Sequence, residues 1–284
     1  MRYLVPAVTL ALLVACRGNA PVPPDETPSS IAILSAQELQ SSQGLTVVHV
    51  VRTAQEFEEG HIPGAQMLLL SDIIVERNGL QNELPEVAVL EAAFERVGVK
   101  DDLRVVAYSA DPLLSGRALF TLDYLGHRDI AYLDGGIAAW RTLGGAVETG
   151  PGSGAAGTFT PALRPEAIVD ADWVNAHRQD ATVAIIDARP ADQHQAGRIP
   201  GSTNIYWQTL LNTEGKLLPE AELRARFEAA GAAPGKTVIT YCRTGVQASV
   251  LHVVARYLGY STRMYDGSFT DWSARTELPV QSGP

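Results

Sequence analysis

The pattern of apolar and polar residues alternates along the chain between short strand-like runs and longer segments with helical periodicity. Short runs rich in β-branched residues, such as TVVHVV (46–51) and TVITYC (237–242), have the length and composition of buried strands. Longer segments, such as PEVAVLEAAFERVGV (85–99), carry apolar residues near i, i+3, i+4 and i+7, which predicts amphipathic helices. Strands that alternate with helices in this way predict an α/β fold, in which helices flank both faces of parallel-type sheets.

The order of predicted elements occurs twice. Each half runs helix, strand, turn, helix, strand, loop, helix and strand. The elements of the first half are at 35–42, 46–51, 85–99, 104–109, 116–126 and 130–136, and those of the second at 170–179, 182–187, 219–232, 237–242, 247–259 and 262–268. Gly126 and Gly259 follow corresponding leucines and are predicted to end their helices.

The two halves also match in sequence. Three pairs of segments are alike: 47–68 with 183–205, 105–127 with 238–260, and 132–140 with 264–272. The first pair aligns Arg52 with Arg189. A segment rich in Gly, Pro and Ala separates the halves, which is typical of a linker. The chain is therefore predicted to hold two domains of one architecture, at 31–147 and 163–284, with the linker at 148–162.

Composition and charge narrow the class of partner. The chain has 284 residues, 46% of them hydrophobic, so it can bury a substantial core. Its formal net charge is −10 and no cluster of Lys and Arg is present, so we expect no nucleic-acid partner. A small anionic substrate would need a local positive pocket.

The first residues have the pattern of an export signal. Arg2 precedes an apolar run at 4–14 that is too short to span a bilayer permanently. Leu13-Val14-Ala15-Cys16 resembles a bacterial lipobox, which implies a signal peptide at 1–15, cleavage before Cys16 and a lipid on its sulfur. An ordinary signal peptide that contains a cysteine is the alternative.

The segment after Cys16 is typical of a tether. Residues 16–30 are polar and rich in Pro, which favours an extended chain. The lipobox implies a periplasmic protein held to a membrane by its lipid anchor, and the absence of Asp after Cys16 favours the outer membrane in a Gram-negative cell. Lipidation would leave Cys242 unpaired; a disulfide between Cys16 and Cys242 would require a form without lipid.

Cys242 lies where a predicted strand changes to a predicted helix. The carboxyl ends of parallel strands are where such sheets bind ligands. Gly245 can adopt a positive φ in this turn, which lets backbone N–H groups converge on an anion. The helix dipole and Arg243 add positive potential, so we predict a thiol pKa lowered from about 8.5 to below neutral and a stabilised persulfide. A buried structural cysteine is the alternative.

Other chemistries lack a required residue. A cysteine phosphatase needs Cys-x5-Arg, but that position is Ala248. A thioredoxin-type site needs a second cysteine where Gly245 stands, and a cysteine protease needs a partner histidine, whereas His252 lies within the same predicted helix. Four other histidines show no metal-ligand spacing, so we predict no metal site: His49, His127, His177 and His194. We also expect no cofactor.

Three segments resemble one family, the tandem-domain rhodaneses, which are thiosulfate or 3-mercaptopyruvate sulfurtransferases. FEEGHIPGAQML (57–68) and YDGSFTDW (265–272) resemble the two family signatures, with Asp271 where Glu is usual. YCRTGVQAS (241–249) resembles the active loop, with the six-residue length that is typical of sulfurtransferases rather than of related phosphatases. The resemblance covers residues 31 to 279.

The resemblance implies a reaction and a set of site residues. A sulfane sulfur would pass from an anionic donor, thiosulfate or 3-mercaptopyruvate, through a Cys242 persulfide to cyanide or a thiol. The tandem domains themselves favour a monomer. A carrier or partner-binding module with low turnover is the alternative. Donor binding is assigned to the strand-end arginine and the active loop: Arg189, Arg243, Thr244, Gly245, Val246 and Gln247. For Arg189 an ion pair with Asp187 or Asp192 is left open.

The sequence departs from the family in both halves. Thr244 and Gln193 stand where many thiosulfate-using members carry cations, whereas Arg243 favours thiosulfate. In the first half Ser109 occupies the Cys242 position, and Asp111 and Pro112 would make a poor anion site. The first domain is therefore predicted to be catalytically inactive and structural, with a separate binding role left open.

Overall fold

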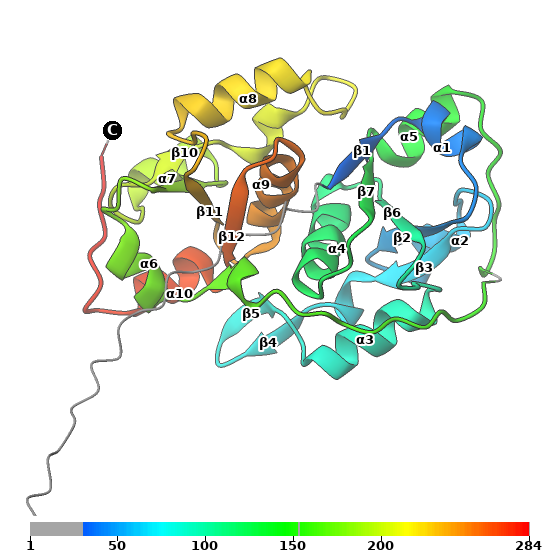
Figure 1. Ribbon diagram of the computed structural model, residues 1–284, viewed down its shortest axis with the longest axis horizontal. Helices are drawn as coiled ribbons and strands as arrows, with labels where there is room; N and C mark the ends of the chain where they lie inside the picture. Colours follow the sequence, from blue (N-terminus) through cyan, green and yellow to red (C-terminus); the bar gives the residue numbers. More distant parts are fainter. Residues whose placement is uncertain (1–30, 153, 284) are drawn as a thin grey trace, which may run out of the picture.

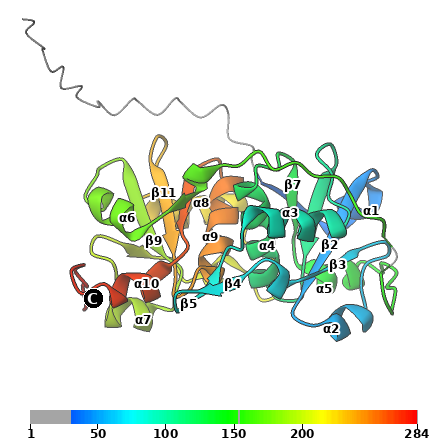
Figure 2. The ribbon, with the colours of Figure 1, turned by 90° about the horizontal axis from the view of Figure 1, so that it is seen from below.

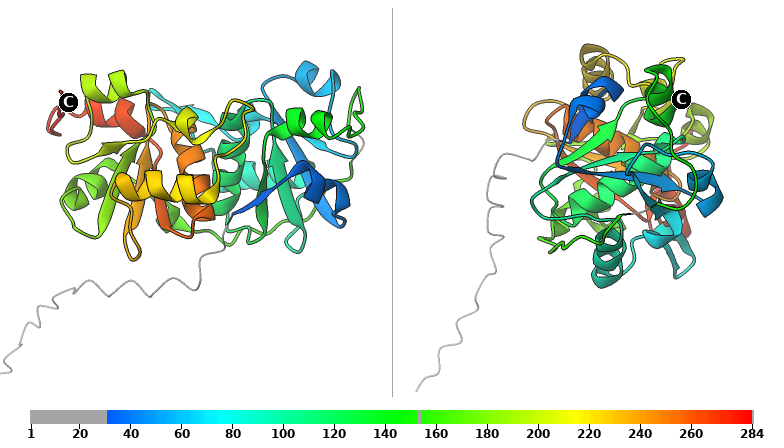
Figure 3. Two further views of the ribbon diagram at one scale, coloured as in Figure 1. Left: turned by 90° about the horizontal axis from the view of Figure 1, so that it is seen from above. Right: turned by 90° about the vertical axis from the view of Figure 1, so that its right-hand side faces the viewer.

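The computed structural model describes residues 31–152 and 154–283. The predicted signal peptide, the tether and Cys16 lie outside the described residues. Two lobes lie side by side, and each is built around one five-stranded parallel sheet (Figures 1 and 3). The predicted α/β class with parallel sheets is therefore confirmed. No described helix is both long and apolar enough to cross a membrane.

The first sheet has the strand order β1-β7-β6-β2-β3. Its strands are β1 (Ala32–Leu34), β2 (Leu45–Val51), β3 (Gln66–Leu69), β6 (Arg104–Tyr108) and β7 (Ile130–Leu133). Helices α3 and α4 cover one face and α1, α2 and α5 the other. These helices are α1 (Ala36–Ser41), α2 (Ala54–Glu58), α3 (Val87–Arg96), α4 (Pro112–Tyr124) and α5 (Gly136–Thr142).

The second sheet repeats this order as β8-β12-β11-β9-β10. Its strands are β8 (Ile168–Val169), β9 (Val183–Asp187), β10 (Thr203–Asn204), β11 (Thr237–Tyr241) and β12 (Ser261–Tyr265). Helices α8 and α9 pack on one face, and α6 and α10 on the other. The helices are α6 (Ala171–His177), α7 (Ala191–Ala196), α8 (Glu220–Ala229), α9 (Val246–Tyr257) and α10 (Ser268–Ala274).

Alternation along the central strands sends neighbouring side chains to opposite faces. In β11, Val238 joins the core under α8 and α9, whereas Ile239 joins the core under α6 and α10. The β-branched run therefore serves two cores at once, as the sequence predicted for a strand buried on both faces. Gly126 and Gly259 both have positive φ, +81° and +84°, just after α4 and α9, which confirms their predicted role as helix ends.

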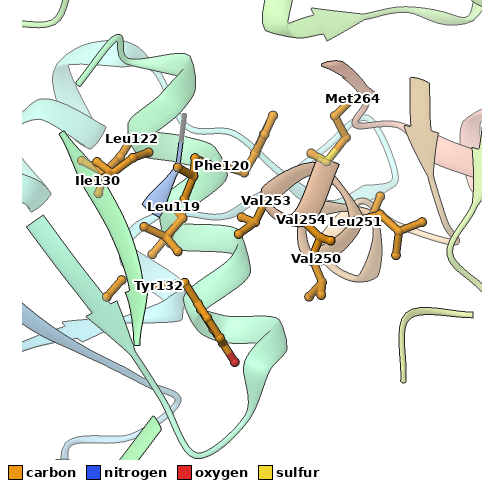
Figure 4. Close-up of a cluster of buried hydrophobic side chains, with 14 of the residues drawn as sticks. Leu119, Phe120, Leu122, Ile130, Tyr132, Val250, Leu251, Val253, Val254 and Met264 are labelled. Carbon is orange, nitrogen blue, oxygen red and sulfur yellow. The ribbon is translucent and has the colours of Figure 1, made fainter. Parts of the chain in front are cut away.

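The lobes meet where α4 packs against α9 (Figure 2). These helices are equivalents in the two halves, and their apolar side chains face each other across the junction (Figure 4). Gly116 lies at the contact, because a Cβ there would be 3.0 Å from Val250 Cγ2. One continuous core thus extends from α3 through both central helices to α8.

The predicted central strands and long helices are observed, with the helix expected at 116–126 beginning earlier, at Pro112. The edge strands β1, β3, β8 and β10 were missed because each has only two to four residues. A two-stranded hairpin, β4 (Val75–Arg77) and β5 (Leu80–Glu83), was also missed. It leaves the first lobe and lies beneath β12 at the junction (Figure 1).

Candidate active site at the end of β11

Cys242 directly follows β11, at the carboxyl edge of the second sheet. Its backbone N–H donates to Ser268 Oγ at 3.1 Å, and its carbonyl oxygen accepts from Phe269 N at 2.9 Å. These bonds tie the loop to the start of α10. The residue is 1% exposed, so its side chain is enclosed rather than presented at the surface.

The turn after Cys242 supplies backbone donors to the sulfur. Gly245 is the N-cap of α9 with φ +88°, and no side chain caps this helix. The first-turn amides are therefore not taken by a side-chain oxygen. Instead, the backbone N–H groups of Thr244, Gly245, Gln247 and Ala248 act on the Cys242 thiol, and each favours a lower pKa. This geometry agrees with the convergent amides that the sequence predicted.

The pKa of the thiol is a correction to the sequence prediction. Burial raises the pKa of Cys242, and the four backbone N–H groups oppose this shift without reversing it. The predicted value below neutral is therefore wrong for the free thiol. The amides and the helix dipole can be inferred from the local sequence, but the enclosure of the side chain cannot. Removal from water disfavours the thiolate.

The five predicted loop residues surround the thiol but differ in access. Arg243 is exposed, Gly245 is buried, and Thr244, Val246 and Gln247 are half-buried. Arg243 forms no ion pair within the described chain, and its Nη2 lies 3.5 Å from Gln193 Oε1. Arg243 therefore places an exposed positive charge beside the loop.

The Arg189 side chain is buried and does not extend toward the solvent. Its guanidinium is 2% exposed and binds Asp187, with Nη2–Oδ2 at 2.6 Å, and it lies 4.1 Å from the Phe269 ring centroid. Asp187 also accepts from His194 Nδ1 at 2.9 Å. The ion pair that the sequence left open is what the structure contains, so the assignment of Arg189 to donor binding is corrected.

Two residues of the first lobe were not predicted, one of which contacts the active loop and the other a residue packed beside it. Asn82, at the end of β5, donates from Nδ2 to Thr244 Oγ1 at 2.9 Å. Arg117 of α4 binds Asp266, which follows β12, with Nη1–Oδ1 at 2.6 Å. Asp266 and Arg117 lie within segments that the repeat had aligned, but nothing in the local sequence marks Asn82.

The equivalent turn in the first lobe offers fewer free backbone donors. Ser109 stands in the Cys242 position, and Asp111 caps α4 by accepting from Leu113 N at 3.0 Å. Pro112 follows and has no N–H to donate. Both features agree with the prediction that this lobe has no catalytic turn.

Across residues 31–152 and 154–283, no group of three or more His, Cys, Asp or Glu side chains is arranged to hold a metal ion.

Similarity to known proteins agrees with this geometry. A family model described as the rhodanese-like domain matches residues 35–143 and 170–275. The chain belongs to the rhodanese family. Both repeats match the rhodanese model, which confirms the resemblance to the tandem-domain members.

Rhodanese relatives extend over most of the chain. The protein named 3-mercaptopyruvate sulfurtransferase of Escherichia coli K12 is 33% identical over 241 residues, covering 80% of this chain and 85% of the relative. The putative thiosulfate sulfurtransferase SseB of Mycobacterium tuberculosis is 30% identical over 246 residues, covering 79% and 84%. The protein described here is therefore a sulfurtransferase of the rhodanese type.

A solved rhodanese has the same fold. The crystal structure of SseA from Escherichia coli, which is described as a 3-mercaptopyruvate sulfotransferase, superposes with a TM-score of 0.75 at 29% identity. The match covers 84% of this chain and 99% of SseA. The two-lobed arrangement is therefore shared over the full length of that relative.

Proposed function

We propose that this sulfurtransferase carries a sulfane sulfur on Cys242, from thiosulfate or a related donor such as 3-mercaptopyruvate to cyanide or a thiol. One observation carries the proposal: an uncapped helix start directs its backbone N–H groups onto a single sulfur. Such donors stabilise negative charge, whether it lies on the thiolate or on the outer sulfur of a persulfide. The protein would act as a monomer on small molecules.

The proposed reaction consists of two sulfur transfers. The Cys242 thiolate attacks the outer sulfur of thiosulfate, the sulfur–sulfur bond of the donor breaks, and sulfite leaves with the electron pair. Cyanide then attacks the outer sulfur of the Cys242 persulfide, thiocyanate leaves, and the thiolate is restored. This sequence is ping-pong covalent catalysis, in which one cysteine is nucleophile and then leaving group.

Arg243 supports thiosulfate as the first donor to test. Its exposed guanidinium has no carboxylate partner in the described chain, so it can approach a dianion. Arg189 and Gln193 do not add to this charge, since one is paired with Asp187 and the other is neutral. We therefore expect weak donor binding and a high KM for thiosulfate.

Steady-state kinetics test the assignment. The full chain is incubated with cyanide and with either thiosulfate or 3-mercaptopyruvate, and product formation is followed. Thiocyanate should form with the wild type and not with Cys242→Ser. Equal rates for the two proteins would remove Cys242 from the reaction.

A carrier with low turnover is the second candidate, and the burial of the thiol favours it. A side chain that is 1% exposed with a raised pKa is a slow nucleophile at neutral pH. A carrier would take up one sulfur per chain from thiosulfate and release it slowly to cyanide. Multiple rapid turnovers would exclude a carrier function.

We also propose that the protein is exported and anchored to a membrane through a lipid on Cys16. The proposal rests on the lipobox and the Pro-rich segment that follows it. Expression with a radiolabelled fatty acid in a bacterial host should label the wild type in the membrane fraction. If Cys16→Ser is labelled and sedimented to the same extent, the anchor is not at Cys16.

A further inference from the structure

We propose that Asn82 and Arg117, both from the first lobe, are positioning residues that hold the active loop of the second lobe in its sulfur-binding geometry. The inference deepens the proposed function of Cys242 and rests on it. It assigns a definite task to the lobe that lacks the cysteine. The contacts that carry it cross the junction between the lobes on two separate elements, the β4–β5 hairpin and α4.

Arg117 forms the more deeply buried of the two contacts. It is 0% exposed, and its guanidinium forms a two-point contact with Asp266, at 2.6 and 3.1 Å. Its Nη2 also donates to the carbonyl oxygen of Asn82. One side chain of α4 therefore fixes both the segment after β12 and the end of the hairpin, as a planar guanidinium can when its donors diverge.

Asp266 transmits this contact to the active loop. A Cβ on Gly245 would lie 2.4 Å from Asp266 Oδ1 and 3.2 Å from Arg117 Nη1, so the pair lies directly against the turn. Gly245 is the residue at which the loop becomes α9, and its amide is one of the four that act on Cys242. The Arg117–Asp266 ion pair thus packs against Gly245 and keeps its amide in place.

Asn82 holds a second point of the same loop. Its backbone is left-handed, with φ +63°, which turns the end of β5 toward the second lobe. Its side chain donates to Thr244 Oγ1 at 2.9 Å, and the Thr244 amide is another of those that act on the sulfur. Two of the four amides are therefore restrained from the first lobe, because a loop residue held by its side chain has fewer backbone conformations open to it.

The test removes the Asn82–Thr244 bond and leaves the backbone undisturbed. Asn82→Gly keeps the left-handed conformation and the carbonyl that accepts from Arg117, and Thr244→Val removes the hydroxyl from the other side. Asn78→Gly is the matched control, because Asn78 is also left-handed, φ +54°, in the same hairpin. Two quantities are measured: kcat/KM for sulfur transfer, and the pH midpoint for alkylation of Cys242 by iodoacetamide.

We expect Asn82→Gly to lower kcat/KM about three- to tenfold, the scale of one neutral hydrogen bond, and to raise the alkylation midpoint by about half a pH unit. Thr244→Val should do the same, and the double variant should be no worse than either single one. A merely structural role would not move the alkylation midpoint, so this readout separates positioning from folding. Arg117→Lys, which keeps the charge but loses the two-point contact, should raise the midpoint further.

Two results would overturn the inference. One is an Asn82→Gly protein that matches Asn78→Gly in both measurements. The other is a double variant whose loss of kcat/KM equals the product of the losses in Asn82→Gly and Thr244→Val. Independent effects of this kind would mean that the bond is not their cause. Alkylation needs no sulfur donor, so it tests positioning even if the wild type transfers no sulfur, a result that would overturn the proposed function alone.

Discussion

At the residue scale, the difference between the two lobes lies in how two equivalent helices begin. Gly245 leaves the amides of α9 for the Cys242 sulfur, whereas Asp111 and Pro112 occupy the start of α4. This contrast could be predicted, because the φ range of Gly, the missing N–H of Pro and the capping preference of Asp are local properties. The thiol pKa could not, since it depends on burial by residues far along the chain.

Replacing Gly245 tests whether the site depends on this turn. Gly245→Ala meets both a left-handed backbone and Asp266 Oδ1 at 2.4 Å, whereas Gly231→Ala meets a positive φ, +93°, with open space around it. We expect Gly231→Ala to cost about 1 kcal/mol in the free energy of unfolding with unchanged kcat. Gly245→Ala should cost about 2 kcal/mol or more and lower kcat at least tenfold. Urea unfolding and the thiocyanate assay measure both, and equal losses in the two variants would contradict this account.

At the element scale, the β4–β5 hairpin shows what a linear pattern cannot predict. The strands have three and four residues, and β4 is exposed throughout, so they carry no strong periodicity. The hairpin owes its structural role to contacts with residues far along the chain, such as that between Asn82 and Thr244. The long helices and central strands were predictable because each buries a whole face or both faces.

Glu83 should give the hairpin a pH-dependent contribution to stability. Partial burial, together with repulsion from Asp266 and Asp271 that Arg117 and Arg77 only partly offset, raises the pKa of Glu83 to about 7. The pKa of Glu83 is thus higher in the folded chain than in the unfolded chain, where it is about 4.3. Its contribution to the free energy of unfolding is fully present below about pH 4.3 and is lost as the pH rises through 7.

Glu83→Gln keeps the shape of the side chain and removes the charge. Relative to the wild type, the variant should therefore be more stable at pH 8 than at pH 5.5, by about 1 kcal/mol after allowance for solvent screening. Urea unfolding of both proteins at the two pH values measures this. A wild-type-to-variant difference that does not change with pH would show that Glu83 is ionised throughout.

At the scale of the whole molecule, a buried polar cluster joins the lobes beside the apolar core. Asp123 of α4 accepts from His252 Nε2 of α9 at 2.8 Å and pairs with Arg164 and Arg256. Burial alone would raise the pKa of Asp123, but the His252 hydrogen bond and the two arginines lower it to about 2. His252 is fully buried in this cluster.

His252 should make the junction weaker in mild acid. Burial lowers the pKa of the imidazole more than Asp123 raises it, so the unfolded chain binds a proton more readily than the folded one. Stability is then lost as the pH falls below about 6.5, by up to 1.4 kcal/mol per pH unit. His252→Gln can still donate to Asp123 but does not titrate. Between pH 7.5 and 5.5 the wild type should lose about 1 kcal/mol more than the variant in urea unfolding, and parallel losses would refute the prediction.

The central claim is that the Cys242 sulfur accepts the outer sulfur of a donor and then gives it up. Thiosulfate labelled with a heavy isotope at its outer sulfur can be mixed with the full chain and sampled by intact-mass and peptide mass spectrometry before and after cyanide is added. The account predicts a gain of one heavy sulfur on the peptide that contains Cys242, and its recovery in thiocyanate. Labelled thiocyanate that forms while Cys242 never gains mass, or forms equally with Cys242→Ser, would contradict it.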